Sequence, residues 1–152
     1  MKSALLESIR TQLKASLERI AKAAMDAHAA ATDPDCKAEG KYDTRSLEAS
    51  YLAAGQARQV DEMAEAARVF DVITLPEFTM DDPIGMGALV EADIRGETSM
   101  LLLVPAAGGM VLNMDGQEIT LLTPASKLYQ RLLGKRPGDF LEEFDLLVIE
   151  VS

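Results

Sequence analysis

Apolar residues recur every three or four positions along the first part of the chain, which is the pattern of an amphipathic helix. This stripe predicts a helix over residues 3–31, and a second stripe predicts another over residues 44–70. The two are separated by a polar interval at residues 32–43. Two helices of similar length joined by a short connection close most simply as an antiparallel coiled coil. We therefore expect residues 1–70 to form a helical hairpin with its tip in the polar interval.

The periodicity changes after residue 70, where short apolar runs alternate with turn residues. The predicted strands are Val72–Leu75, Ala88–Ile94, Met100–Pro105, Met110–Asn113, Glu118–Leu122 and Leu146–Val151. Gly108-Gly109 and Asp115-Gly116 suit tight turns, so the third, fourth and fifth strands are expected to form a meander. A short helix over residues 126–133 is expected to end at Gly134. The chain is thus predicted to be α+β, with a helical hairpin followed by an antiparallel β domain over residues 71–152.

The negative charge of the chain is concentrated in this second half. Residues 1–70 carry ten Lys and Arg against eleven Asp and Glu, whereas residues 71–152 carry five against fourteen. The second half therefore holds -9 of the net charge of -10 of the whole chain. Excess acid keeps a protein soluble, and it also repels the phosphate backbone of nucleic acids. Any role with nucleic acid should therefore pass through a protein partner that has a basic surface.

Cysteine usage and hydropathy indicate a cytoplasmic protein. Cys36 is the single cysteine in the sequence, so no disulfide can form within the chain. The first residues alternate charged and apolar side chains and do not resemble a secretion signal. No window approaches the roughly 20 apolar residues of a membrane span. We expect no membrane partner.

The polar interval carries several carboxylates, including Asp33, Asp35 and Glu39. Such residues are commonly solvated loop acids. Asp43 precedes the second predicted helix, where a carboxylate can accept hydrogen bonds from the free amide groups of the first turn. Thr44 could serve as the same helix cap.

Residues 119–139 resemble the C-terminal signature of the GreA/GreB family of transcript cleavage factors. In that family a Ser-Pro-Leu-Gly type of segment leads into a helix that ends in Leu-Leu-Gly-Lys and is followed by a Gly-Asp turn. Lys127 and Tyr129 stand where the family has its proline and glycine. The residues that fit the pattern are Ser126, Leu128, Leu132, Leu133, Gly134, Lys135, Gly138 and Asp139.

The resemblance implies a fold and a partner. The hairpin would be followed by an FKBP-like β domain that docks beside the secondary channel of RNA polymerase, with Ser126, Leu128 and Lys135 as candidate contacts. Leu128 has a second interpretation, as a residue of the core. The chain would reach nascent RNA only through the polymerase. The sequence leaves the oligomeric state open between a monomer, which is the expected state, and a pair of Ala-rich hairpins.

The resemblance also implies a role for the tip. The coiled coil would enter the channel, where Asp43 and Glu48 would help to hold catalytic Mg²⁺ shared with the polymerase and stimulate cleavage of backtracked RNA. The isolated chain would not be an enzyme and would bind no cofactor. Mg²⁺ prefers oxygen ligands, which suits carboxylates.

This sequence departs from the acidic pair of the family, and the difference leaves other functions open. When Tyr51 is aligned with the family tyrosine, Thr44 and Leu47 occupy the positions of the two family acids, and Asp43 and Glu48 are each displaced by one residue. One residue corresponds to about 100° of rotation on a helix. The alternatives are therefore a regulator that occupies the channel without cleavage, or a coiled-coil adaptor that does not contact the polymerase.

Overall fold

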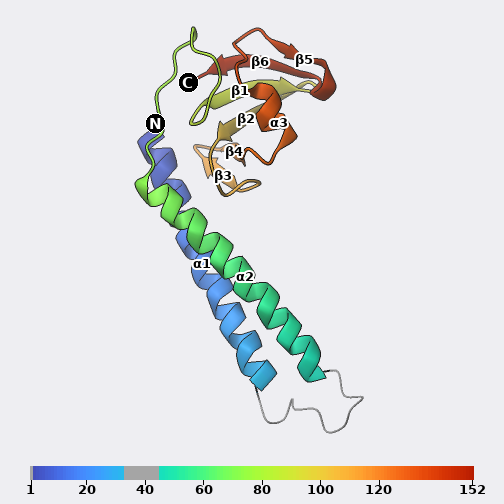
Figure 1. The fold of residues 1–152 in the computed structure, drawn as a ribbon. Helices are drawn as coiled ribbons and strands as arrows, with labels where there is room; N and C mark the ends of the chain where they lie inside the picture. The colour runs from blue at the N-terminus through green and yellow to red at the C-terminus, as the bar shows by residue number, and fades with distance from the viewer. Residues whose placement is uncertain (1, 33–44) are drawn as a thin grey trace. The chain divides into compact units, whose positions relative to one another are not determined.

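The computed structural model describes residues 2–32 and 45–152, except for the side chains of residues 27, 30–32 and 45–53. Helix α1 spans Lys2–Thr32 and helix α2 spans Arg45–Val72, which confirms both predicted helices. The two helices pack side by side and run in opposite directions (Figure 1). The chain divides into two compact units, one formed by Arg10–Arg68 and the other by Met1–Ile9 with Val69–Ser152.

Burial along α1 follows the predicted apolar stripe. The most buried side chains lie in its first half, and the burial decreases to intermediate at Leu17 and Ile20. Alanine dominates the stripe farther along, and its small side chain allows helices to approach closely while burying little area. Among the described side chains of the two helices, the buried apolar ones are Leu5, Leu6, Ile9, Leu13, Ala66 and Phe70.

The second part of the chain forms a mixed sheet, six-stranded within the described residues, with the strand order β3-β4-β2-β1-β6-β5. Helix α3 spans Lys127–Leu132, and a 3-10 turn, η2, spans Glu142–Phe144. The α+β fold class is confirmed. The strands are β1 Leu89–Ile94, β2 Glu97–Leu103, β3 Val111–Met114, β4 Gln117–Leu122, β5 Phe140–Leu141 and β6 Leu146–Val151.

The predicted meander is wrong. Strand β4 lies between β2 and β3, and it runs parallel to β2 with Leu102 beside Leu121. The connection from β2 to β3 therefore passes the position that β4 occupies, and β2 and β3 do not form a tight hairpin. Its backbone is held to β4, since the Gly109 amide donates to the Leu121 carbonyl at 2.9 Å. The sheet is consequently mixed, whereas the sequence predicts an antiparallel one.

Two hairpin turns have the backbone conformation that a two-residue turn requires. Asp115 and Gly116 have φ values of +53° and +80°, as their sequence predicts. Arg95 and Gly96 form a second such turn between β1 and β2, with φ values of +53° and +86°. The sequence does not predict this turn, because arginine is an unusual residue at positive φ. The Asp93 carboxylate supports it by accepting a hydrogen bond from the Gly96 amide at 2.8 Å.

The predicted strand Val72–Leu75 is absent. Helix α2 continues to Val72, and the Ile73 amide still donates to the Val69 carbonyl at 3.2 Å. The β-branched composition of this run favours a strand only where a neighbouring strand completes its hydrogen bonds. The chain finds no such neighbour here and leads without regular structure to Pro76.

The core of the β domain lies on the sheet face that α3 covers. Alternate residues of β1, β2 and β6 point into it, among them Val90, Leu103 and Val148. Tyr129 and Leu132 enter from α3. The edge strand β5, which the sequence patterns did not indicate, adds Leu141.

Candidate functional site

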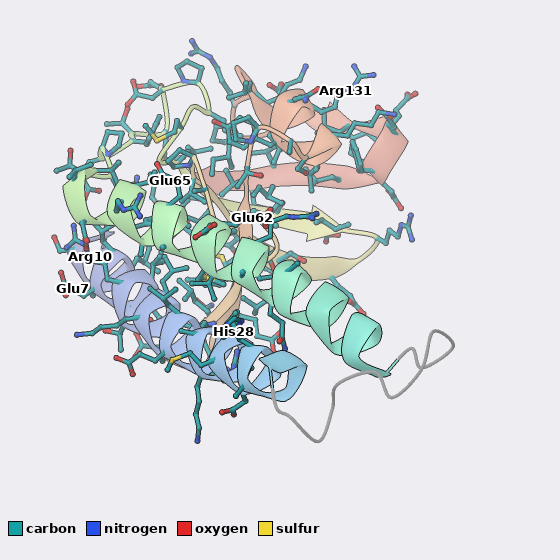
Figure 2. All side chains as sticks on the ribbon, turned by 60° about the horizontal axis from the view of Figure 1, so that its bottom comes forward. Glu7, Arg10, His28, Glu62, Glu65 and Arg131 are labelled. Carbon is teal, nitrogen blue, oxygen red and sulfur yellow. The ribbon has the colours of Figure 1, made fainter. Side chains whose placement is uncertain are left out.

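The two candidate metal ligands of the hairpin tip fall at the limit of the described structure. Asp43 lies outside the described residues. Glu48 belongs to the backbone of α2, and its side chain also lies outside the described set. Their assignment to a Mg²⁺ site stays a prediction. Within the described residues, no group of three His, Cys, Asp or Glu side chains is arranged to hold a metal, and His28 lies exposed on α1 (Figure 2).

The signature segment 119–139 begins within β4 and ends in the turn before β5. Several of its residues are structural. Ile119 and Leu121 are buried in the sheet, and Leu132 is fully buried in the core. Gly134 and Gly138 have φ values of +79° and +93°, a backbone region that favours glycine. Much of the segment therefore maintains the fold.

The three candidate partner-binding residues differ in their surroundings. Ser126 is the N-cap of α3 and accepts a backbone hydrogen bond from the Gln130 amide at 3.2 Å. Leu128 is partly buried and packs against the core. The Lys135 carbonyl accepts a hydrogen bond from the Ile84 amide at 2.8 Å, and its side chain is partly exposed. All three residues are partly buried, and their role as partner contacts stays a prediction.

A shallow open pocket of about 440 Å³ lies beside Ser126. Gly108 and Gly109 line one part of it, and Thr123 and Ala125 line another. A Cβ atom at Gly108 would lie 2.7 Å from the Thr123 hydroxyl oxygen. Glycine therefore allows the chain before β3 to approach β4 this closely, and it shapes the pocket.

Ion pairs connect α3 to the 3-10 turn η2. The Glu143 carboxylate lies 2.6 Å from Lys127 Nζ and 3.1 Å from Arg131 Nε. The hydrogen bond from Lys127 lowers the pKa of Glu143, and the charge of Arg131 adds to this effect. Arg131 projects from the outer side of α3 (Figure 2). The Glu143 carboxylate therefore partly neutralises the positive charges of Lys127 and Arg131 on α3.

The segment before β1 is fastened to the end of the signature segment. The Gly134 amide donates to the Ile84 carbonyl at 2.9 Å, and Arg136 donates to the Asp81 carbonyl at 2.8 Å. Asp82 accepts hydrogen bonds from the amide and hydroxyl of Thr79, and these bonds lower its pKa. This side of the domain is thus held by backbone and turn contacts.

Lys2 is a buried residue that no sequence pattern indicates. Its side chain is 4% exposed and donates hydrogen bonds to the carbonyl oxygens of Pro76 and Gly87, the latter at 2.8 Å. The ammonium also lies 4.6 Å from the centre of the Phe78 ring, within the range of a cation–π contact. Burial lowers the pKa of Lys2, and the charge of Glu77 partly opposes the shift. A lysine at the start of a helix gives no sequence signal for such a role.

None of the helices in the described parts of the chain is both long and apolar enough to cross a membrane.

Comparisons with known proteins gave structural matches. No protein-family model matches the sequence, and no curated protein is significantly similar to it. The GreA factor homolog 1 (Gfh1) of Thermus thermophilus matches with 19% identity and a TM-score of 0.38, over 94% of each chain. Gfh1 of Thermus aquaticus matches with 18% identity and a TM-score of 0.36, over 93% of this chain and 92% of its own.

A third structure, of the transcription factor Gfh1, has 20% identity and a TM-score of 0.39, over 95% of this chain and 94% of its own. All three identities lie below 25% and all three TM-scores below 0.5. The chain is therefore similar to a GreA homolog along nearly its whole length, and this similarity does not by itself define an activity.

Proposed function

We propose that this protein binds RNA polymerase and modulates transcription elongation from the secondary channel. The observation that carries the proposal is the signature segment 119–139, which contributes β4, helix α3 and the glycine turns that follow. The helical hairpin that precedes the β domain supports it. The chain would not be an enzyme in its own right, because the reaction would use the active site of the polymerase.

The tip carboxylates are the candidate chemical groups. Asp43 is the first candidate and Glu48 the second, and their oxygen atoms are the donors that Mg²⁺ prefers. When bound at the polymerase centre, Mg²⁺ activates water and stabilises the leaving oxygen in phosphodiester hydrolysis. The role of this chain would be to present carboxylates there. The hairpin suits this role because the paired helices α1 and α2 would carry the tip into a narrow channel.

The test is an RNA cleavage assay on a stalled, backtracked transcription complex. The wild-type protein should shorten the 3′ end of the nascent RNA in a Mg²⁺-dependent reaction, and Asp43→Ala should abolish this activity. Glu48→Ala should reduce it. Asp33→Ala is the matched control, because it removes an acid from the same polar interval and should leave cleavage unchanged.

A non-cleaving regulator is the second candidate, and the one-residue displacement of Asp43 and Glu48 from the family positions favours it. In this case the protein would bind the polymerase, leave the RNA intact and slow nucleotide addition. Binding without cleavage would thus reject the first candidate and support the second. Failure to bind polymerase would reject both.

A further inference from the structure

The segment that leads from α2 to β1 folds back on itself between Pro76 and Gly87. A Cβ atom at Gly87 would overlap the ring of Pro76, so the two ends of this stretch lie in direct contact. Residues 76–87, all of which the structure describes, form neither a helix nor a strand. A compact stretch of this length whose ends meet is an Ω-loop. We call it the 76–87 loop.

Lys2, at the start of α1, connects the two ends of this loop. Its ammonium donates hydrogen bonds to the carbonyl oxygens of Pro76 and Gly87, one at each end. The ring of Phe78, which belongs to the loop, lies 4.6 Å from the same nitrogen. A buried ammonium requires such partners, because a charge that loses water without them is costly. One charged group therefore bridges both ends of the loop.

The body of the loop is ordered by its own contacts. The Asp82 carboxylate accepts hydrogen bonds from the amide and the hydroxyl of Thr79, at 2.8 and 3.0 Å. Ile84 is buried in the core of the β domain, and Phe78 packs against that core. Segments that are held together in this way tend to open and close as cooperative units.

The other side of the loop is bound to the end of α3. The Ile84 amide donates to the Lys135 carbonyl at 2.8 Å, and the Ile84 carbonyl accepts from the Gly134 amide at 2.9 Å. Arg136 adds an exposed side-chain hydrogen bond to the Asp81 carbonyl at 2.8 Å. The loop thus contacts the start of α1 on one side and the turn after α3 on the other.

The contacts of the loop differ in strength. A hydrogen bond from an ammonium is stronger than one between neutral groups, and the two bonds from Lys2 are formed at the point where the loop closes. We propose that the 76–87 loop opens and closes as one unit and that Lys2 is the residue that holds it closed. Lys2 then also stabilises the hydrogen bonds between Ile84 and the Gly134 turn, in which it takes no part.

The test is amide hydrogen exchange of the full-length protein, followed residue by residue. Lys2→Met keeps an unbranched apolar chain at this position and removes the ammonium. The Ile84 and Gly134 amides should then exchange roughly tenfold faster, as expected for the loss of hydrogen bonds to a charged group. Lys14→Met is the matched control variant, because Lys14 is exposed on the same helix, and it should leave these rates unchanged.

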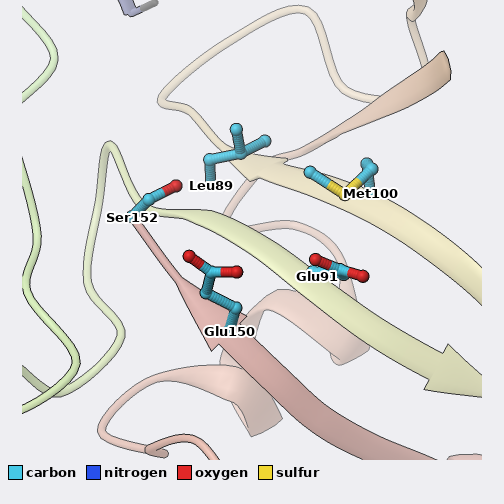
Figure 3. A pocket seen from close by; sticks show the side chains of 5 residues that line it. All are labelled: Leu89, Glu91, Met100, Glu150 and Ser152. Atoms are coloured by element: carbon cyan, nitrogen blue, oxygen red, sulfur yellow. The ribbon is translucent and has the colours of Figure 1, made fainter. Parts of the chain in front are cut away.

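Two further amides serve as internal controls. The Leu133 amide donates to the Tyr129 carbonyl at 3.2 Å, within the last turn of α3. The Leu89 amide donates to the Ser152 carbonyl at 2.9 Å, and the two residues lie side by side where β1 meets the end of β6 (Figure 3). Neither hydrogen bond involves the loop, so both amides should exchange in Lys2→Met as they do in the wild type.

A second measurement starts from the opposite side of the loop. Acylation with the N-hydroxysuccinimide ester of acetic acid, followed by mass spectrometry, should label Lys2 much more slowly than the exposed Lys14. Arg136→Gln removes a contact on the α3 side and should raise the labelling rate of Lys2 about fivefold, because coupling between two sites is reciprocal. Arg131→Gln is the matched control, since Arg131 pairs with Glu143 outside the loop, and it should leave that rate unchanged.

The remaining outcomes each overturn the proposal. If the Leu133 and Leu89 amides accelerate as much as those of Ile84 and Gly134, Lys2 stabilises the whole domain and does not control the loop. Slower exchange in Lys2→Met would mean that burying the ammonium costs more than its hydrogen bonds return. Unchanged exchange would show that other contacts hold the loop closed.

The labelling experiment decides the question if Lys2→Met does not fold. Equal labelling of Lys2 in the wild type and in Arg136→Gln would then overturn the proposal. Both measurements use the isolated protein, so their results are independent of the proposed function.

Discussion

Gly87 has the most constrained backbone among the glycines of the β domain. Its φ is +90°, and a Cβ atom would lie 2.4 Å from Cδ of Pro76, far inside van der Waals contact. The Gly87 carbonyl also accepts a hydrogen bond from Lys2. The start of α1 and the segment before β1 are thus held together at a point where only glycine fits.

A substitution at Gly87 should therefore be more harmful than one at another glycine with positive φ. Gly96 has a φ of +86°, and a Cβ atom added there would meet nothing within 4 Å, which makes it the matched control. Gly96→Ala should lower the free energy of unfolding by about 1–2 kcal/mol through backbone strain alone. Gly87→Ala should add the clash with Pro76 and lower it by roughly 3 kcal/mol or more. Urea unfolding measures both, and equal losses would contradict the steric role of Pro76.

At the scale of elements, two sets of contacts on opposite sides hold α3 in place. Tyr129 and Leu132 anchor one side in the core. On the other side, Lys127 and Arg131 contact Glu143 of η2. The side chains of this ion-pair network are 40–69% exposed, so it contributes modestly to stability compared with the buried side. The helix that carries the candidate contacts is therefore held mainly by burial, with a smaller contribution from charge.

The pKa of Glu143 predicts a pH dependence for this connection. Because the folded-state pKa lies below the ordinary value of 4.5, the carboxylate stabilises the fold at pH 7, and this stabilisation is lost as the pH falls through the lowered pKa. Glu143→Gln should lower the melting temperature slightly at pH 7. At acid pH, where Glu143 is protonated, the two proteins should melt alike.

Glu142→Gln is the control, since it removes a neighbouring acid of the same turn. Its melting temperature should follow that of the wild type more closely at pH 7. A difference between Glu143→Gln and the wild type that persists unchanged into acid would mean that the ion pairs with Lys127 and Arg131 do not stabilise the fold. High salt should reduce the effect at pH 7, because the groups are exposed.

At the scale of the whole molecule, the net negative charge disfavours direct binding of nucleic acid and favours contact through a partner. The net charge is -10, and residues 71–152 carry fourteen acids against five Lys and Arg. A surface of this sign repels phosphate. Any contact with RNA would then depend on the cations supplied by a partner. The expectation of a protein partner with a basic surface agrees with this charge distribution.

The isolated protein should accordingly fail to bind RNA. Fluorescence anisotropy of a labelled single-stranded RNA should stay unchanged on titration with the protein at moderate salt, because the acidic surface releases no counterions from the phosphates. Adding polymerase should restore an association through the ternary complex. Direct, salt-sensitive binding by the isolated chain would show that a local basic surface outweighs the net charge.

Local patterns predicted the elements of this fold well. Contacts between residues three and four apart define a helix, so the apolar stripes located α1 and α2 to within two residues. Strand β6 and the helix-terminating Gly134 were also predicted correctly. The Val72–Leu75 run was misassigned because its composition suits a strand, whereas hydrogen bonds to the preceding turn continue α2 through Val72.

The candidate site could be predicted only in part, because some of its residues belong to one contiguous segment and others depend on contacts with residues far away in the sequence. Ser126, Leu128 and Lys135 are predicted from a contiguous signature, which is readable along the chain, and their contact role stays a prediction. Lys2 was missed because its acceptors, Pro76 and Gly87, lie far away in sequence. Asp43 and Glu48 remain predictions from the sequence. The domain boundary at residue 70 is also still a prediction from the sequence.

The sequence by itself determined the helices, most of the strands and the acidic character of the second half, since these follow from neighbouring residues and from composition. Only the tertiary structure decided that β4 lies between β2 and β3 and that Glu91 opposes Glu150. Strand order and register arise from pairing between distant segments. Their stability depends on which side chains are buried together, a property that no single segment contains.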